Sequence, residues 1–208
     1  MCILEARKPG PFRGRSPALF ALLAILLTSI AAAAQQQPSS EPILQVETGM
    51  HTGRLTRASV DAAGRILATA ADDKTVRLWS LATGEQIRVL RLPIGDGNEG
   101  KLFSVAVSPD GKWVAAGGWT GYQWEHQDCI YLFEIDGRLA RRITGLPNVI
   151  NELKWSHDGR LLAVGLGGKN GIRVFRSEDW KEVARDTDYA EQAYGLDFDS
   201  SGRLAAKM

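Results

Sequence analysis

The chain has 208 residues, of which 44% are hydrophobic and 24% are charged, and its formal net charge is +1. This composition is typical of a globular protein and excludes a disordered chain or one built of membrane spans. A net charge so close to zero also excludes recruitment of nucleic acid by bulk charge.

Residues 1–34 have the pattern of a secretory signal peptide. Basic residues precede an apolar run over 18–30, and the run ends in the four alanines 31–34. We expect cleavage after Ala34, because small residues stand where signal peptidase requires them, and a polar linker over 35–41. The alternative is an uncleaved membrane anchor, since the apolar stretch nearly spans a bilayer of about 30 Å. A leader of this kind suits a Gram-negative bacterium, so the expected compartment is periplasmic or secreted.

Downstream of the leader, one pattern of short strands occurs four times. Each copy centres on a glycine, and successive glycines are 47, 48 and 43 residues apart. These anchor glycines are Gly64, Gly111, Gly159 and Gly202. Apolar residues stand four and six positions before each of them. Since side chains alternate between the two faces of a strand, one face of this first strand is expected to be buried.

Three further strands are expected in each copy, because the glycine tolerates the positive φ of a tight hairpin turn. Second strands fall at 65–70, 112–117 and 160–165. Third strands fall at 75–80, 129–134 and 171–176, and fourth strands at 86–90, 139–143 and 182–185. Four short antiparallel strands at this period describe one blade of a β-propeller.

The predicted fold class is all-β, with an incomplete propeller over 42–208. About three four-stranded antiparallel blades are expected, at about 51–91, 99–144 and 148–186. Half-blades are expected at both ends, as a strand over 42–47 and a partial blade over 192–208. Rings need about four to eight blades. A truncated product is therefore the leading interpretation, and a half-ring that closes by association with another copy is the alternative.

Two stretches of the chain resemble the WD-repeat family: VSPDGK at 107–112 and ADDKTVRLW at 71–79. The resemblance covers about 42–206 and implies a structural tetrad, in which a histidine, a hydroxyl, an aspartate and a tryptophan form a buried hydrogen-bond chain. The matching positions are His51, Thr69, Asp73 and Trp79. The His and Asp could be mistaken for a catalytic pair, but the hydroxyl and the indole already occupy them.

The later blades depart from the family pattern. Phe133 and Phe175 stand where the family has its tryptophan, and Lys169 stands where the turn aspartate would be. These blades are therefore expected to depend on apolar packing.

The candidate partner-binding residues lie in an insertion over 117–126, between the second and third strands of its blade. They are Trp119, Tyr122 and Trp124. Aromatic side chains in a long loop often anchor a partner, because each buries a large area and carries a polar tip. Folding back onto their own blade is the alternative, and the sequence leaves the two open.

Other suggestive patterns have simpler interpretations. The glycine-rich segment 163–170 lacks the defining ends of a phosphate-binding loop and is interpreted as a turn. Glu125, His126, Asp128 and Cys129 include metal-capable side chains, but neighbours on an extended strand point to opposite faces. No metal or cofactor is therefore expected. Cys129 is interpreted as an unpaired strand residue, because the only other cysteine, Cys2, lies in the leader.

The resemblance implies a non-catalytic scaffold that binds a protein partner and is not an enzyme. The alternative is the propeller portion of a longer exported enzyme, such as a caspase-like peptidase with WD repeats. Nucleic acid is not an expected partner, and a membrane is expected only through an uncleaved leader. Self-association through open blade edges is a further expectation, since unpaired strand edges invite pairing.

Overall fold

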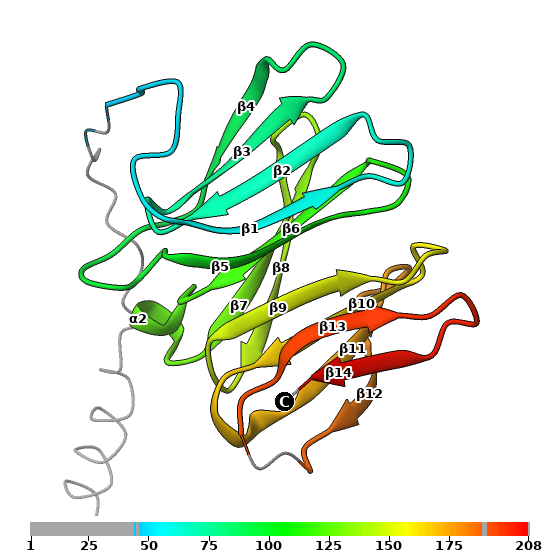
Figure 1. Ribbon diagram of the computed structural model, residues 1–208. Helices are drawn as coiled ribbons and strands as arrows, with labels where there is room; N and C mark the ends of the chain where they lie inside the picture. The colour runs from blue at the N-terminus through cyan, green and yellow to red at the C-terminus, as the bar shows by residue number, and fades with distance from the viewer. Residues whose placement is uncertain (1–43, 45, 189–190, 208) are drawn as a thin grey trace, which may run out of the picture. The chain divides into compact units, whose positions relative to one another are not determined.

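The computed structural model describes residues 44, 46–188 and 191–207 (Figure 1). All of them belong to the compact unit Gln36–Met208. The predicted leader and linker, 1–41, lie outside the described residues. Within the described part of the chain, no helix has the length and apolar character needed to cross a membrane.

In the residues that the structure describes, fourteen strands form three four-stranded antiparallel sheets and a two-stranded one. The first sheet, blade 1, contains β1 (Leu55–Val60), β2 (Ile66–Ala71), β3 (Thr75–Ser80) and β4 (Gln86–Arg91). Blade 2 contains β5 (Leu102–Val107), β6 (Trp113–Gly118), β7 (Asp128–Glu134) and β8 (Leu139–Leu146). Blade 3 contains β9 (Ile150–Trp155), β10 (Leu161–Leu166), β11 (Ile172–Arg176) and β12 (Glu182–Asp186). Blade 4 is the hairpin β13 (Tyr194–Phe198) and β14 (Leu204–Lys207).

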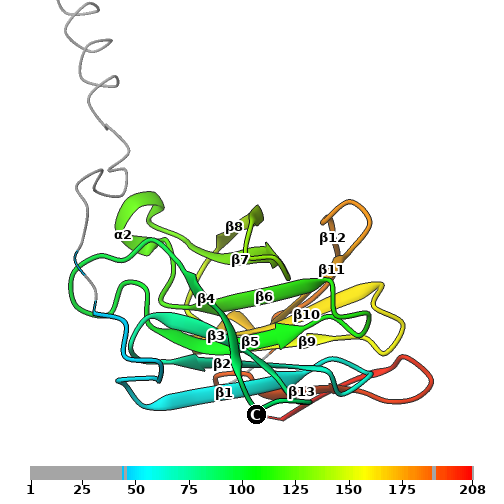
Figure 2. The same cartoon turned by 90° about the horizontal axis from the view of Figure 1, so that it is seen from above.

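The predicted all-β fold, a partial propeller of four-stranded antiparallel blades, is confirmed. The first strands of successive blades, β1, β5, β9 and β13, are neighbours, and Figures 1 and 2 show them along one side of the assembly of sheets. The later strands of each blade lie progressively farther from this side (Figure 2). We call β1, β5, β9 and β13 the inner strands.

The motif around each anchor glycine folds the hairpin between the first two strands. In blade 2 the Ser108 hydroxyl donates to Asp110 Oδ1 at 2.6 Å and accepts the N–H of Trp113 at 2.9 Å. Gly111 has a φ of 73°, in the region that glycine adopts without strain. Ser156 and Asp158 make the same bond at 2.6 Å in blade 3. The repeated Ser-x-Asp-Gly motif therefore satisfies the polar groups of the turn locally.

The core consists of apolar layers between adjacent blades. One layer joins blades 1 and 2, a second joins blades 2 and 3, and a third joins blade 3 to the terminal hairpin. Three of the four residues that stand four positions before an anchor glycine enter these layers, as the alternation predicts, whereas Val60 is exposed. Val107, Trp155 and Phe198 are each buried against the preceding blade.

Side chains also link inner strands that share no backbone ladder. The Ser59 hydroxyl of β1 accepts the N–H of Val107 on β5 at 3.0 Å. The Ser104 hydroxyl of β5 accepts the N–H of Leu153 on β9 at 2.7 Å. These bonds satisfy donors at the boundary between blades, where no β-ladder reaches them.

One expected element is not formed at its described residues. The strand predicted over 42–47 has no sheet pairing at Leu44 or at 46–47. A strand requires a hydrogen-bonded neighbour. The Glu47 carboxylate instead makes ion pairs with Arg77 at 2.7 Å and with Arg91 at 3.0 Å, both on blade 1.

The two ends of the blades differ in their connections. At the end that we call the hairpin end, the turns between first and second strands and between third and fourth strands are short. At the opposite end, the loop end, longer segments occur over 92–101 and 119–127 (Figure 1, left side). Long loops on a rigid framework are where binding residues concentrate. The loop end is therefore the candidate region for a functional site.

Candidate interaction surface

The four residues of the predicted tetrad lie together at the loop end of blade 1. Trp79 Nε1 donates to Thr69 Oγ1 at 2.9 Å, and Thr69 Oγ1 lies 2.9 Å from His51 Nε2. His51 Nδ1 lies 2.9 Å from Asp73 Oδ2. Because an indole only donates and a carboxylate only accepts, the chain runs from Trp79 to Asp73 and requires the imidazole proton on Nδ1. With all four side chains engaged, the arrangement is structural.

The insertion of blade 2 contains a one-turn helix, α2 (Tyr122–Glu125), where the sequence predicts only a loop (Figure 1). Left-handed backbone at both ends makes the helix this short. Gly121 has a φ of 103° before it, and His126 has a φ of 54° after it. A side chain on Gly121 would also lie 2.8 Å from Cys129 Sγ, so only glycine fits there.

Two buried carboxylates hold the insertion against its blade. Glu99, from the β4–β5 loop, accepts the N–H groups of Gly121 and of Gln123, the latter at 3.1 Å. Asp128, at the start of β7, accepts the N–H of Thr120 at 3.0 Å. These bonds fix the backbone on both sides of Tyr122, so the insertion is an ordered platform.

The environment of Asp128 disfavours its charged form. Burial raises the pKa of Asp128 to about 6; the hydrogen bond from Thr120 opposes this shift, and the nearby Glu99 charge adds to it. Its second oxygen, Oδ2, is buried and has no hydrogen-bond partner among the described residues. The insertion is thus anchored partly by a carboxyl group that changes charge near neutral pH.

The three candidate aromatic residues differ in their exposure to solvent. Tyr122 is 51% exposed, and Trp119 is half-buried and borders two cavities. Trp124 is only 8% exposed. The interpretation of Trp124 as a partner-binding residue is therefore corrected, because its ring folds back against its own blade and is not available to a partner.

A family comparison identifies the repeats. The family model described as "WD domain, G-beta repeat" matches residues 44–80 and 84–122, which include blade 1 and the first half of blade 2. These two segments of the chain are thus similar to WD repeats. The tetrad and blade topology agree with this assignment.

Relatives of the WD repeats come from plants and fungi. The chain is 31% identical to the guanine nucleotide-binding protein subunit beta of Nicotiana tabacum over 116 residues, which are 56% of this chain and 28% of the relative. It is 39% identical to ribosome biogenesis protein ERB1 of Candida glabrata over 62 residues, which are 29% of this chain and 8% of the relative. The matched segments of this chain thus cover less than a third of the length of either relative.

A solved structure supports the fold assignment. The "Structure of U3-55K" superposes with a TM-score of 0.59 at 18% identity, covering 71% of this chain and 43% of that one. At this identity the likeness shows the fold alone.

The metal-capable side chains Glu125 and Cys129 are paired or buried. Glu125 pairs with Arg142 at 2.7 Å on the outer side of the blade. Cys129 is fully buried, and burial raises its pKa to about 12. No group of three metal-capable side chains comes together in the part of the chain that the structure describes.

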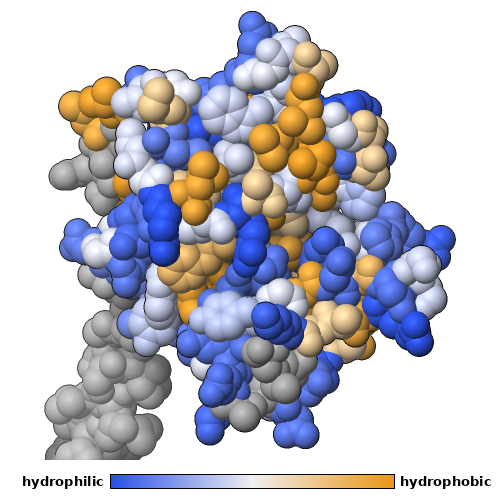
Figure 3. All heavy atoms as spheres, viewed as in Figure 1, coloured by the Kyte–Doolittle hydropathy of each residue, from blue (hydrophilic) through white to orange (hydrophobic). Residues whose placement is uncertain are grey.

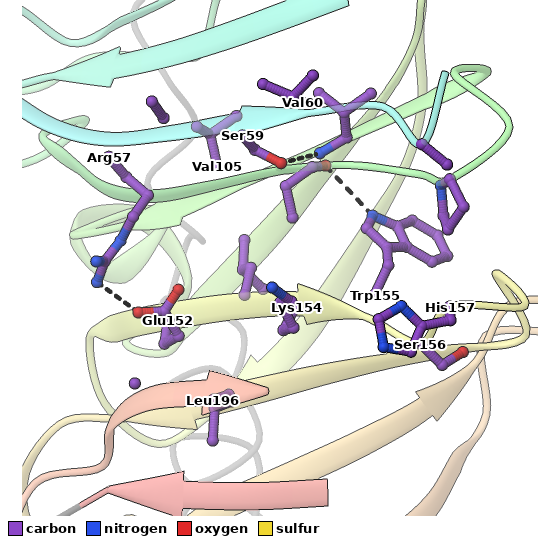
Figure 4. A pocket seen from close by; sticks show the side chains of 17 residues that line it. Arg57, Ser59, Val60, Val105, Glu152, Lys154, Trp155, Ser156, His157 and Leu196 are labelled. Carbon is purple, nitrogen blue, oxygen red and sulfur yellow. Dashed lines mark hydrogen bonds and ion pairs between the residues drawn. The ribbon is translucent and has the colours of Figure 1, made fainter. Parts of the chain in front are cut away.

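A groove along the inner strands is an alternative site. Figure 4 shows Arg57 of β1 and Glu152 of β9 pointing toward one another across it, and the two form an ion pair. Lys154 pairs with Asp197 of β13 at 3.1 Å. Because these four charged groups pair with one another, the groove does not offer them to a charged ligand.

Sequence reasoning missed the partners that organise the loop end. Asp96, Glu99 and Gln123 share a cavity with Trp119 and Tyr122, although Glu99 and Gln123 belong to different loops. No periodicity marks such residues. The signal that could have found them is the unusual length of the β4–β5 loop, which contains three glycines at 95, 97 and 100.

Proposed function

We propose that this WD-repeat chain is a non-catalytic scaffold that binds a protein partner at its loop end, with Trp119 and Tyr122 as the anchors. One observation carries the proposal: an exposed tyrosine and a half-buried tryptophan stand on an insertion that buried carboxylates hold rigid. A rigid aromatic anchor loses little conformational entropy on binding.

The relatives are consistent with a scaffold. One is named as the beta subunit of a guanine nucleotide-binding protein, and hence as part of an assembly. The loop end also has mixed charge, because the loop over 92–101 contains Asp96, Glu99 and Lys101. Nucleic-acid surfaces are strongly basic instead, so a protein is the partner that we propose.

A site-specific cross-linker tests this proposal. A photoreactive phenylalanine analogue replaces Tyr122 in one variant and Val183 of β12 in a control, whose side chain is 47% exposed. We expect a discrete cross-linked protein only from position 122, and its purified form should lose binding to Trp119→Ala. Equal cross-linking from both positions, or binding that survives Trp119→Ala, refutes the proposal.

A second proposal concerns self-association through the open face of blade 1. Val60 is 46% exposed, whereas its equivalents Val107, Trp155 and Phe198 are buried by a preceding blade. Figure 3 shows apolar side chains gathered over β1 and β2. An exposed apolar sheet face favours association.

Sedimentation velocity of the full chain checks this second proposal. We expect concentration-dependent dimers or larger species that Val60→Glu abolishes and Val183→Glu does not. A monomer at all concentrations contradicts it.

We propose further that the chain is exported to the periplasm of a Gram-negative bacterium. The basic, apolar and alanine-rich order of residues 1–34 supports this. Fractionation of such a host should recover a protein that begins at Gln35. A cytoplasmic protein that retains its leader refutes export.

A further inference from the structure

The loop end contains a cavity of about 370 Å³ between the β4–β5 loop and the α2 insertion. This volume is in the range of small ligand sites. Trp119 and Tyr122 form part of its wall, so the cavity belongs to the surface proposed above for the partner. The side chains that line the cavity indicate which chemical group it binds.

The aromatic part of the wall offers π faces. Tyr122 is exposed, and its ring makes an edge contact with His126, with centroids 6.1 Å apart and planes at 85°. Trp119 is half-buried at the same wall. The negative faces of such rings attract cations.

The charged part of the wall consists of two carboxylates, and Asn98 and His126 add neutral polar groups to it. Asp96 is exposed at the cavity, and the buried Glu99 carboxylate lies at its inner side. Gln123 Oε1 is buried without a hydrogen-bond partner among the described residues. It reaches this place only because residue 95 is glycine, since a Cβ there would lie 1.7 Å from the amide oxygen.

No lysine or arginine lines the cavity among the described residues. The Lys74 ammonium interacts electrostatically with both carboxylates and donates to Gly95 O at 2.8 Å. Lys74 therefore offsets part of the negative charge from outside the wall. The exposed Asp96 carboxylate still lines the cavity without a lysine or arginine beside it in the described wall.

We infer that this cavity receives a basic side chain, arginine or lysine, from the protein partner. The inference rests on the proposed scaffold function and names the chemistry of its partner. A guanidinium or ammonium group can lie against Trp119 and Tyr122 while donating to Asp96. The inner-strand groove lacks this property, because its charged groups already pair with one another.

The neighbouring cavity supplies the competing prediction. It also borders Trp119, but Arg54 and Arg57 line it. Arg54 pairs with Asp72 and Arg57 pairs with Glu152, so an acidic group gains less on that side of the indole than a basic group gains beside Asp96. Trp119 thus reports on both cavities, and the charge of the probe separates them.

The test uses the full chain, labelled with nitrogen-15, and two small probes. The Trp119 indole N–H signal is assigned with Trp119→Phe. We expect saturable shifts of this signal with N-acetyl-arginine methylamide at millimolar concentration, and little change with N-acetyl-glutamate methylamide. No shift with the arginine probe, or an equal shift with the glutamate probe, overturns the inference.

Variants that change the charge at position 96 provide a second test of the inference. Asp96→Asn should weaken the arginine probe about 2–5-fold, as loss of an exposed ion pair does, and Asp96→Lys should weaken it about 10-fold or more. Asp136→Asn is the matched control, because Asp136 is an exposed turn aspartate at the hairpin end. Unchanged affinity in both Asp96 variants contradicts the inference.

The outcomes separate this inference from the scaffold proposal. If the cross-linked partner requires Trp119 but binds Asp96→Lys normally, the scaffold stands and the basic side chain is refuted. If the arginine probe binds as expected but position 122 cross-links no protein, the cation preference stands and the scaffold is refuted.

Discussion

Replacing Asp73 by alanine should lower the stability of the chain substantially. The carboxylate accepts four hydrogen bonds: from His51 Nδ1 at 2.9 Å, Thr52 N at 3.0 Å, Thr75 N at 3.1 Å and Thr75 Oγ1 at 2.8 Å. The side chains of His51 and Asp73 are each only 6% exposed. Water can reach Thr52 in the variant, but it cannot easily replace the bonds to the buried groups.

The expected magnitude follows from the groups left unpaired. Each stranded buried donor costs about 1–3 kcal/mol, and the imidazole and the Thr75 hydroxyl are both stranded, so the loss is about 2–6 kcal/mol. For a chain of this size that loss lowers Tm by about 4–24 °C. Circular dichroism melting of Asp73→Ala, with Asp136→Ala as control, measures it.

The pH dependence of this loss has a definite sign. Burial raises the pKa of Asp73, but the hydrogen bonds from Thr75, Thr52 and His51 outweigh burial and hold it below its ordinary value. The contribution to stability is therefore present at neutral pH and is lost as the pH falls through the folded-state pKa. The difference in Tm between the wild type and Asp73→Ala should therefore narrow in acid. A neutral-pH Tm like that of Asp136→Ala, or a gap that widens in acid, would refute the reasoning.

Three other positions give sharp expectations. The pKa of Asp128 is raised to about 6, so the wild type loses stability as the pH rises through 6; Asp128→Asn, which keeps the acceptor, should gain about 1–3 kcal/mol at pH 7.5 and nothing near pH 4, by melting curves. Trp180 has a φ of 60°, so Trp180→Gly should be more stable than Trp180→Ala in urea, the reverse of the usual order. In a Cys2→Ser background, a disulfide reagent should not label Cys129 until the protein is denatured, because burial raises its pKa to about 12; rapid labelling of the folded protein would contradict this.

Most of the fold was predictable because it depends on local, repeated chemistry. The alternation before Gly111 and Gly159 marks the buried face of each inner strand, and both glycines adopt the positive φ that their turns require. The tetrad could be placed residue by residue, since His51 and Trp79 occupy the family's positions.

The interaction surface could not be predicted in the same way, because it depends on contacts between loops. Nothing adjacent in the sequence connects Glu99 with the N–H of Gln123, or Asp128 with that of Thr120. The burial of Trp124 also follows from how α2 turns at Gly121, and a sequence pattern does not encode that direction.

The serine bonds between inner strands have a consequence for how such modules are exchanged. Neighbouring blades share no continuous β-ladder, yet Ser59 and Ser104 each fix the position of the next inner strand by accepting one of its N–H groups. A blade transplanted between propellers loses such a bond wherever its new neighbour does not supply the matching group, and that boundary then has to repack. Modularity in this architecture thus belongs to the pair of neighbours, and a single blade is not the interchangeable unit.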